Sequence, residues 1–418
     1  MKLHWQILIA LVLAVIIGSA SSSLEATFGF SPLPSFDFVG SLFLNALKMI
    51  IVPLIVSSII VGISNIERDG SFARMGGKTL LYYVCTSAIA IMIGLVLVML
   101  IQPGVINGQP AQQVLGLHAD TAAVAERVGG SSGSDIVAIF LRLIPSNVIH
   151  AAAEGQMLGL IFFSLLFGYF IAHCGENSQR TLKGFFQGVF EVMMKITDLV
   201  MRFAPLGVFA LVAAVVARSG LGVFIPLAKF FFTVVAALLL HLLVVLPLLL
   251  KLVAGVSPIK HFRAMAPALL TAFSTSSSAA TLPMTMDCIE KRAGVSNQSS
   301  SFVLPLGATI NMDGTALYEC VAALFIAQAY GLELGMVQQF TVVSLALMTS
   351  IGVAGIPSAS LVAITIILAA MGLPIEGIGL ILAVDRILDM SRTAVNIFSD
   401  SCGAVIIARS EGEETKLV

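Results

Sequence analysis

The sequence predicts an all-α polytopic membrane protein. Of its 418 residues, 58% are hydrophobic and 11% are charged, whereas an ordinary soluble protein is about 25% charged. Long apolar runs such as 7–17 and 234–250 would aggregate in water and are stable in lipid. The mean hydropathy of +1.02 agrees with these two observations. A soluble globular fold is therefore excluded.

The order of basic and acidic loops predicts how the chain threads through the membrane. Ten apolar stretches follow one another, at 5–20, 38–63, 79–101, 136–173, 190–216, 223–252, 264–286, 299–330, 339–371 and 377–408. The connections 64–78, 174–189 and 251–263 are basic, so we expect them in the cytoplasm. The connections 21–37 and 102–134 are poor in basic residues, so we expect them outside. Both termini are expected in the cytoplasm.

Two of these stretches are expected to enter the membrane and return on the same side. Stretch 264–286 has basic residues on both flanks, and stretch 339–371 has acidic but no basic ones. Their middles contain helix-interrupting residues, at 274–278 and 352–360. Irregular backbone is tolerated at membrane depth only beside protein or a water-filled cavity, so such interruptions indicate the binding site of a transporter. The alternative, two ordinary spanning helices with small packing faces, breaks the alternation of charge.

The last stretch has one polar face on an otherwise apolar helix. At about 100° per residue its polar residues fall within an arc of about 80°; they are Asp385, Asp389, Arg392, Asn396 and Asp400. An ionisable group at membrane depth costs roughly 2.5–3.5 kcal/mol and is functional by default. Arg392 can hold a carboxylate with two hydrogen bonds, and Asp389 can hold an ammonium group. They predict a site for a zwitterion with an additional carboxylate; a structural ion ladder is the alternative and explains Asp385 adequately.

Stretch 299–330 is interrupted by the run Gly307-Ala308-Thr309-Ile310-Asn311-Met312-Asp313-Gly314-Thr315. Asn, Asp and Gly are poor helix formers, and an unwound helix exposes its backbone carbonyls. Carbonyl, amide and carboxylate oxygens together suit a small cation such as Na⁺. A plain helix kink is the alternative, but it does not explain a buried carboxylate at Asp313.

Other ionisable residues also stand within the predicted spans. Glu319 lies one turn beyond Thr315 and has no basic partner nearby in the sequence. Since burial favours the protonated carboxyl, a proton-carrying role and a neutral structural role are both open. Lys48, Lys229 and His241 are expected to reach the membrane boundary or to lie at subunit contacts.

Several other chemistries find no support. The net charge is −1 with no basic stripe, so no nucleic-acid partner is expected. The five cysteines lack metal-ligand spacing and are expected to be small core residues. Gly76-Gly77-Lys78-Thr79 lacks the upstream glycine of a phosphate-binding loop, because Phe72 stands there. No hydrolase motif is present, so we expect neither an enzyme nor an organic cofactor. The first apolar run is expected to be a retained helix.

Three motifs resemble the dicarboxylate/amino acid:cation symporters, a family with excitatory amino acid transporters and archaeal aspartate transporters. They are Asn311–Thr315, the serine-rich 274–278 with Thr281–Pro283, and Asp389–Asn396. The resemblance covers essentially the whole chain and is strongest from 270 to 408. Each motif alone is weak, but the combination is specific.

The resemblance implies eight transmembrane helices plus two re-entrant helical hairpins, with inverted repeats, in a homotrimer among the lipids of the plasma (cell inner) membrane. A fixed scaffold would comprise residues 1–78 (helices 1 and 2) and 135–218 (helices 4 and 5). An elevator-type transport domain would comprise residues 79–103 (helix 3) and 219–410 (helix 6, hairpin 1, helix 7, hairpin 2 and helix 8).

The resemblance also implies the site residues. The substrate would be held by Ser277, Ser278, Thr315, Ile356, Asp389, Arg392, Thr393 and Asn396. One Na⁺ would use the carbonyls of Gly307, Asn311 and Asn396 and the carboxylate of Asp400. A second would use carbonyls of Thr309, Met312, Ser350, Ile351 and Val353. A third would use Tyr83, Thr86, Ser87, Asn311 and Asp313. Glu319 matches the position that carries a proton in animal members.

Three positions depart from the family pattern. Archaeal relatives have an arginine at the position of Ser276, and animal relatives have one at that of Met390. This chain has neither, but Arg386 lies one turn before Met390 and is the candidate for the same electrostatic role. Potassium counter-transport depends on whether its guanidinium reaches that space. Ser360 stands where relatives usually have glycine beside the ligand, which bears on the size of side chain accepted.

These inferences lead to a secondary active symporter that imports L-glutamate or L-aspartate, or both, with Na⁺ and with H⁺ as a further coupling ion. A proton-only symporter for the same substrates is one alternative, since Glu319 is present. A channel on the same scaffold is another, since the polar stripe could line a pore. An intramembrane hydrolase using Asp389 and Asp313 is not supported, because its paired-aspartate helix motifs are missing.

Overall fold

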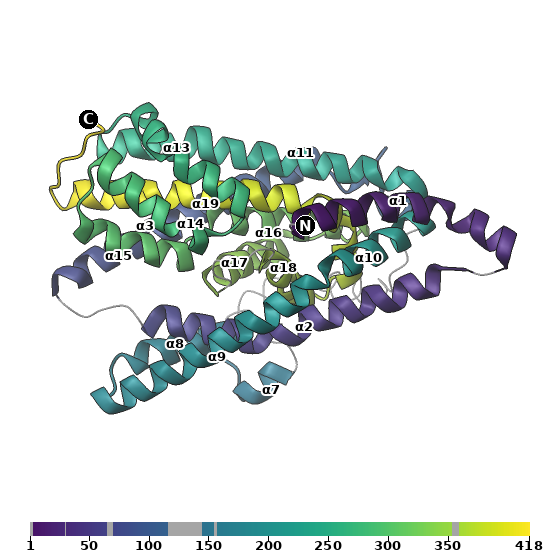
Figure 1. Ribbon diagram of the computed structural model, residues 1–418, viewed down its shortest axis with the longest axis horizontal. Coiled ribbons are helices and arrows are strands. Elements are labelled where there is room, and N and C mark those ends of the chain that lie inside the picture. Colours follow the sequence, from purple (N-terminus) through teal and green to yellow (C-terminus); the bar gives the residue numbers. More distant parts are fainter. Residues whose placement is uncertain (1–2, 30, 65–69, 116–143, 154–156, 353–358) are drawn as a thin grey trace.

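The computed structural model describes residues 3–29, 31–64, 70–115, 144–153, 157–352 and 359–418. These parts are mostly helical, and their helices lie in two packing groups (Figure 1). A short hairpin of β1 (Val105–Ile106) and β2 (Gln109–Pro110) turns at Asn107-Gly108. The prediction of an all-α architecture is thus confirmed for the main elements.

The first packing group forms around α2 (Leu33–Ser64). This helix packs against α8, α9 and α10, and α1 joins the group through α10. Leu47 and Leu54 of α2 are each 1% exposed, as expected of a helix covered by neighbours. The other members are α1 (Leu3–Phe28), α7 (Val148–Ala153), α8 (Met157–Ile171), α9 (Glu176–Arg202) and α10 (Ala204–Ser219).

The second packing group forms around α16 (Asp313–Ala329) and α19 (Ile378–Ser410), which pack on each other. α16 is buried along almost its whole length, between α3 and α11 on one side and α17 and α18 on another. The longer members are α3 (Gly70–Ile101), α11 (Phe224–Leu240), α13 (Pro258–Thr275), α14 (Ser278–Asp287), α15 (Asn297–Ile310), α17 (Met336–Gly352) and α18 (Ala359–Met371). The shorter ones are α4 (Ala111–Leu115), α12 (Leu246–Leu249), the 3₁₀ turns η1 (Gly220–Val223) and η5 (Ile375–Gly377), and the π-helical turns η2 (His241–Val245), η3 (Leu250–Ala254) and η4 (Cys288–Ala293).

The predicted span 190–216 is not a straight helix. It belongs to α9 and α10, which are bent by 53° where they meet at Phe203. Pro205 lies in the first turn of α10, and its missing N–H cannot continue the hydrogen-bond ladder of α9. Hydropathy alone does not register such a break, because both sides of it are apolar.

The first predicted hairpin is interrupted where the sequence indicated, and the middle of the second lies outside the described residues. In the first, α13 ends at Thr275, Ser276 adopts a left-handed conformation (φ 52°), and α14 packs back against α13. In the second, α17 and α18 pack on each other and flank residues 353–358, which lie outside the described residues. The helix–break–helix form is therefore observed for the first hairpin, whereas the break of the second and the return of each hairpin to the same membrane side stay predictions.

The predicted interruption of stretch 299–330 is confirmed. α15 ends at Ile310 and α16 begins at Asp313. Between them, Asn311 (φ −102°, ψ 97°) and Met312 (φ −124°, ψ 59°) have non-helical backbones. The two half-helices therefore leave unwound backbone deep inside the second packing group.

Length and composition identify four helices of the described chain as able to cross a membrane, and a fifth if the bent α9–α10 pair counts as one. Four further apolar helices are shorter and lie within α1, α8, α17 and α18. α19 has 33 residues but carries the charged stripe. The several apolar helices agree with an integral membrane protein, and the count of eight stays a prediction.

Candidate functional site

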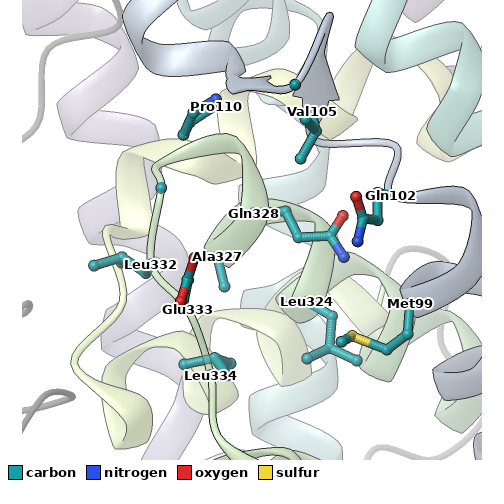
Figure 2. Close-up of a pocket in the computed structure, with 12 residues that line it drawn as sticks. Met99, Gln102, Val105, Pro110, Leu324, Ala327, Gln328, Leu332, Glu333 and Leu334 are labelled. Carbon is teal, nitrogen blue, oxygen red and sulfur yellow. The ribbon is translucent and has the colours of Figure 1, made fainter.

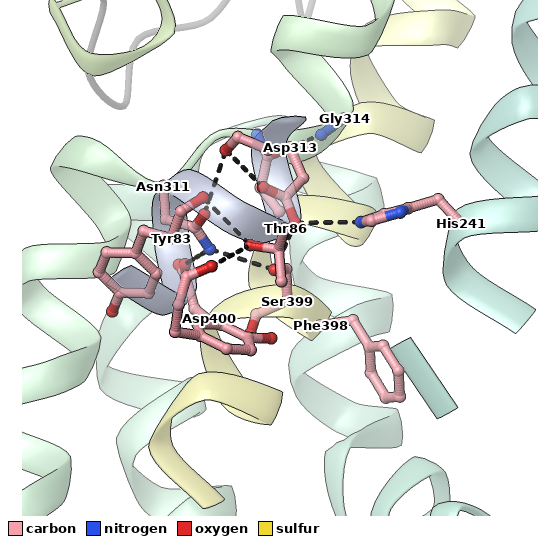
Figure 3. Close-up of polar contacts among 12 residues, drawn as sticks. Tyr83, Thr86, His241, Asn311, Asp313, Gly314, Phe398, Ser399 and Asp400 are labelled. Atoms are coloured by element: carbon pink, nitrogen blue, oxygen red, sulfur yellow. Dashed lines mark hydrogen bonds and ion pairs between the residues drawn. The ribbon is translucent and has the colours of Figure 1, made fainter. Parts of the chain in front are cut away.

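Asp313 lies at the centre of a buried polar cluster at the α15–α16 break (Figure 3). Ser87 of α3 donates a 2.6 Å hydrogen bond to its Oδ1, and Ser399 of α19 donates a 2.6 Å hydrogen bond to its Oδ2. His241 begins the π-helical turn η2, and its Nε2 lies 3.0 Å from the same Oδ2. Both His241 and Asp313 are 0% exposed. Four elements that are distant in the sequence therefore meet at one carboxylate.

Asn311 joins this cluster to Asp400. Its Nδ2 donates to Ser399 Oγ at 3.1 Å and to Asp400 Oδ1 at 2.9 Å. Gly307 lies beside the same carboxylate, since a Cβ there would stand 2.5 Å from Asp400 Oδ1. Only glycine allows the backbone to approach so closely. This proximity is what a backbone carbonyl and a carboxylate need in order to share one small cation.

Within the described residues, Asp313 and Asp400 have polar partners and no lysine or arginine partner. Among the described contacts, no Lys or Arg forms an ion pair with either carboxylate, and their partners are hydroxyl, amide and imidazole groups. An uncompensated buried charge is costly. The residues predicted for the first and third cations, which share Asn311, thus lie in one buried polar region, and cation binding there stays a prediction.

Two predicted ligands of the third cation direct their hydroxyls elsewhere. Tyr83 OH donates to the Val303 carbonyl at 2.7 Å, and Thr86 Oγ1 lies 3.0 Å from the Tyr82 carbonyl. Both residues are buried at the edge of the cluster (Figure 3). The structure thus brings Ser87, Asn311 and Asp313 together and leaves Tyr83 and Thr86 beside them.

Arg392 forms the second centre of the site. Its Nη2 donates to Asp389 Oδ1 at 2.8 Å, and its Nη1 donates to Asp385 Oδ1 at 3.3 Å. Its guanidinium carbon lies 3.8 Å from the centre of the Tyr318 ring, a cation–π contact. Tyr318 OH also donates to Asp385 Oδ1 at 2.9 Å. A side chain that is 1% exposed is thus oriented by three neighbours.

Arg386 shares Asp389 with Arg392. Its Nη1 donates to Asp389 Oδ2 at 3.3 Å. Two arginines and two aspartates therefore balance one another here, unlike the carboxylates of Asp313 and Asp400. The Nε atoms of both arginines are buried and have no hydrogen-bond partner within the described residues. These N–H groups are donors for a ligand carboxylate.

Asn396 and Thr315 connect the two centres. Asn396 Oδ1 accepts from Gly314 N at 2.8 Å, and Asn396 Nδ2 donates to Thr315 Oγ1 at 3.1 Å. A Cβ on Gly314 would stand 2.8 Å from the Arg392 carbonyl oxygen, so the two backbones touch. Thr393 Oγ1 donates to the Asp389 carbonyl at 2.8 Å. The structure therefore groups the predicted substrate residues of α16 and α19.

The tip of the first hairpin contains three consecutive serines, of which Ser276 and Ser278 are buried. Ser277 caps α14 by accepting from Ala280 N at 3.2 Å. Ser276 Oγ is buried without a hydrogen-bond partner within the described residues. Ser278 is 4% exposed and begins α14, which packs against α19. The tip thus belongs to an element that contacts the helix carrying Arg392.

The second predicted cation site falls partly outside the described residues. Val353 lies there, and so does the substrate contact Ile356. Ser350 Oγ donates to Leu347 O at 2.8 Å within α17, which holds Ile351 in its last turn. The other two predicted ligands, Thr309 and Met312, lie on α15 and at the helix break, and α15 contacts α17. This site stays a prediction.

Glu319 is 0% exposed between α16 and α17. Its Oε2 lies 2.7 Å from Thr349 Oγ1, and that hydroxyl also lies 2.7 Å from the Leu345 carbonyl oxygen. One hydroxyl hydrogen cannot serve both acceptors. An ionised Glu319 would accept from the Thr349 hydroxyl, and a protonated Glu319 could donate to it and leave that hydroxyl for Leu345.

Residues 3–410 match the family described as Sodium:dicarboxylate symporter family. The chain belongs to this family. The resemblance inferred from the three motifs is therefore confirmed. This symporter-family protein is a transporter rather than an enzyme.

Three relatives illustrate the range of the family. The chain is 35% identical to the Proton/sodium-glutamate symport protein of Bacillus caldotenax, over 98% of the chain and 95% of that protein. It is 36% identical to the Proton/glutamate-aspartate symporter of Escherichia coli (strain K12), over 98% of the chain and 93% of that protein. It is 36% identical to Excitatory amino acid transporter 3 of Homo sapiens, over 99% of the chain and 87% of that protein.

The structure corrects one expectation about this symporter. His241 neither reaches the membrane boundary nor lies on the surface, because it is fully buried against Asp313. The signal was present: a histidine within an apolar run at membrane depth is costly unless paired. Lys229 does lie on the surface, where its Nζ donates to Val105 O at 3.2 Å. Ser399 and Tyr318 were also missed, since neither residue type is unusual inside a transmembrane helix.

A cavity of about 450 Å³ in this symporter lies away from both centres (Figure 2). Its walls are formed by the end of α3 and the β1–β2 hairpin on one side, and by the end of α16 and the following loop on the other. Its lining includes Gln102, Gln328 and Glu333 among apolar residues such as Met99 and Leu324. None of the predicted substrate or cation ligands lines it, so it is not part of the candidate site.

Proposed function

We propose that this protein is a secondary active symporter that imports L-glutamate, L-aspartate or both with Na⁺ and H⁺. The observation that carries the proposal is the division of charge within one buried site. Asp385 and Asp389 are balanced by Arg386 and Arg392, whereas Asp313 and Asp400 have no such partners among the described residues. The paired aspartates and arginines would recognise a zwitterion, and the carboxylates of Asp313 and Asp400 would require cations.

The arginine centre supports an acidic amino acid as the substrate. The side-chain carboxylate of the substrate would take the N–H groups of Arg392, replacing part of its pairing with Asp385 and Asp389. Asp389 would then be free to accept the substrate ammonium group. The serine tip of hairpin 1 offers donors for the other carboxylate. The names of the relatives, which print glutamate and aspartate, support the same class of substrate.

The link between Asn396 and Thr315 explains how substrate and cations bind together. Thr315 follows the cation ligand Asp313 by two residues, and Asn396 precedes the cation ligand Asp400 by one helical turn. A cation that draws these ligands together therefore also positions Thr315 and Asn396 for the substrate. Linkage is reciprocal, so bound substrate strengthens cation binding by the same factor.

Protons enter the proposal through Glu319. Its geometry with Thr349 and Leu345 is satisfied by the protonated acid. A proton bound there in one orientation of the transporter and released in the other would couple to transport. The names of two relatives, which include both proton and sodium or proton alone, agree with this second ion.

The finer architecture forms part of the same proposal. The packing group around α2 would be the scaffold of a homotrimer in the plasma membrane, covering residues 1–78 and 135–218. The group around α16 and α19, with residues 79–103 and 219–410, would move as an elevator. Its support is that every described residue of the site lies within the second group.

Reconstituted uptake tests this function directly. Purified protein in liposomes should accumulate labelled glutamate or aspartate when inward Na⁺ and H⁺ gradients are imposed one at a time, and an outward K⁺ gradient tests counter-transport. Unlabelled substrate inside should accelerate entry by counterflow. Uptake that ignores Na⁺ would reject the three Na⁺ sites in favour of the proton-only alternative. Substrate flux without counterflow would indicate a channel.

A further inference from the structure

Residues 411–418, here called the strap, leave α19 and pack across the ends of elements that are distant in the sequence. In Figure 1 the strap is the yellow segment between the end of α19 and the label C. It contacts the start of α3, both ends of the first hairpin and the start of α15. These contacts are of three kinds, and each kind fastens a different element.

Ion pairs fasten the strap to α3. Glu411 accepts from Arg74 Nη2 at 2.6 Å and from Lys78 Nζ at 2.6 Å. Hydrogen bonds from Lys78 and Arg74 hold the pKa of Glu411 below its ordinary value of 4.5. The carboxylate is therefore ionised at neutral pH, and the pairing is charge-assisted.

A carboxylate caps α15. Glu413 accepts from Ser296 N at 2.9 Å and from Ser296 Oγ at 2.8 Å. It also accepts from Ser299 Oγ at 2.5 Å, in the first turn of the same helix. An acidic group at a helix N-terminus is favourable because it meets unpaired N–H groups and the positive end of the helix dipole.

Backbone bonds fasten the strap to both arms of the first hairpin. Ser257 N, just before α13, donates to Leu417 O at 2.9 Å, and Lys416 N donates to Ala293 O at the end of η4, also at 2.9 Å. Leu417 is 1% exposed and shares a core with Cys288 and Ala293. The two arms are thus joined through one buried leucine at the end opposite their serine tip.

We propose that the strap is a latch that holds the base of the first hairpin closed and ties it to α3, α15 and α19. The serine tip of this hairpin would then move together with the Arg392 centre as one rigid body. Among the described residues, the hydrogen bonds and ion pairs of the strap involve the first hairpin and neither α17 nor α18. The two hairpins therefore differ in how firmly their bases are held. This inference does not depend on which substrate or ion is transported.

Cys288 is a native reporter of the latch. It is 0% exposed in η4, and its thiol contacts the Ala268 backbone of the opposite arm. A reagent can reach it only when the arms separate. Cys320 is equally buried in α16, away from the strap, and serves as the internal control. Cys85 and Cys174 are exposed and would be replaced by serine.

The experiment measures alkylation of the full chain in native vesicles by N-ethylmaleimide, with labelling at Cys288 and Cys320 followed by mass spectrometry. The double variant Glu411→Gln/Glu413→Gln removes both charges at constant size, and Leu417→Ser removes the buried contact. The matched control is Glu414→Gln, an exposed carboxylate in the same strap. We expect labelling of Cys288 to rise roughly tenfold in both strap variants, as lost charge-assisted bonds allow, with Cys320 and the control unchanged.

The double glutamine variant decides the outcome even if Leu417→Ser fails to fold. Unchanged labelling of Cys288 in that variant would overturn the latch, and so would an equal rise at Cys320, which would indicate general loosening. Because alkylation needs no substrate, a failure of the proposed transport function in the parent protein would leave this result intact.

Discussion

The carboxylate of Asp313 is oriented by two hydroxyls and an imidazole rather than by a lysine or an arginine. Ser87 and Ser399 each donate a hydrogen bond to it, and the imidazole of His241 lies within hydrogen-bond distance of one of the same oxygens. This arrangement fixes the rotamer of Asp313 while leaving its charge for a cation. We therefore assign His241 a positioning role.

The variant His241→Ala should weaken Na⁺ binding without abolishing it. Loss of one hydrogen bond to a buried charged group costs about 1–3 kcal/mol, which corresponds to roughly a 5- to 150-fold rise in the Na⁺ concentration for half-maximal uptake. The maximal rate should change less. His241→Gln retains an N–H donor and should recover part of the affinity. An unaltered Na⁺ dependence in the alanine variant would refute the positioning role.

The contrast between Arg392 and His241 shows what could be predicted at this scale. The polar face of α19 follows from spacing within one helix, and all five of its residues are buried as expected. The partner of His241 is 72 positions away. No local periodicity brings η2 to the α15–α16 break, so its role needed the tertiary structure.

The broken helix α15–α16 depends on close backbone approach at two glycines. Gly307 faces Asp400, and Gly314 faces the backbone of Arg392. Gly307 precedes the unwound Asn311 and Met312 in the chain, and Gly314 follows them. The break could be predicted from the poor helix formers in this run, but the need for glycine at these two positions depends on α19 packing against them.

Gly307→Ala should therefore impair Na⁺-driven uptake and lower thermal stability. The added Cβ would stand 2.5 Å from Asp400 Oδ1 and 2.7 Å from Tyr83 OH, and such overpacking costs about 1–3 kcal/mol. Gly77→Ala is the matched control, since nothing lies within 4 Å of its Cβ. That control should be neutral or stabilising by up to about 1 kcal/mol through helix propensity. Equal melting temperatures and uptake for the two variants would contradict the steric account.

The two packing groups meet along a limited set of helices at the scale of the whole molecule. α10 contacts α19, and α2 contacts α17 and α18. A Cβ on Gly379 of α19 would lie 3.8 Å from Leu211 Cβ of α10. This separation matches the Cβ–Cβ distance of about 3.5–4.5 Å in disulfides, so the boundary between the groups can be cross-linked.

The pair Gly379→Cys/Leu211→Cys should form a disulfide under mild oxidation and stop transport. If the group around α19 moves relative to the scaffold, the bond prevents that motion, and dithiothreitol should restore uptake. Each single cysteine variant serves as the control. Full uptake by quantitatively cross-linked protein would show that the two groups do not move apart here.

Some features of the whole molecule could be predicted from the sequence, and others could not. The membrane class and the helix breaks follow from composition, loop charge and helix-breaking residues. The bend at Phe203 did not follow, because both α9 and α10 present apolar faces and Pro205 also suits an ordinary helix start. The division into two groups likewise rests on contacts between segments such as α2 and α9, which local patterns do not encode.

The central claim is that one buried site binds an acidic amino acid through Arg392 and cations through Asp313 and Asp400. Equilibrium binding of labelled glutamate and aspartate to purified protein tests it most directly, in Na⁺ and in choline, for the parent and for Arg392→Ala. We expect Na⁺-dependent binding by the parent and none detectable by the variant, with the oligomer retained on size exclusion. Undiminished binding of either substrate by the variant would contradict the account.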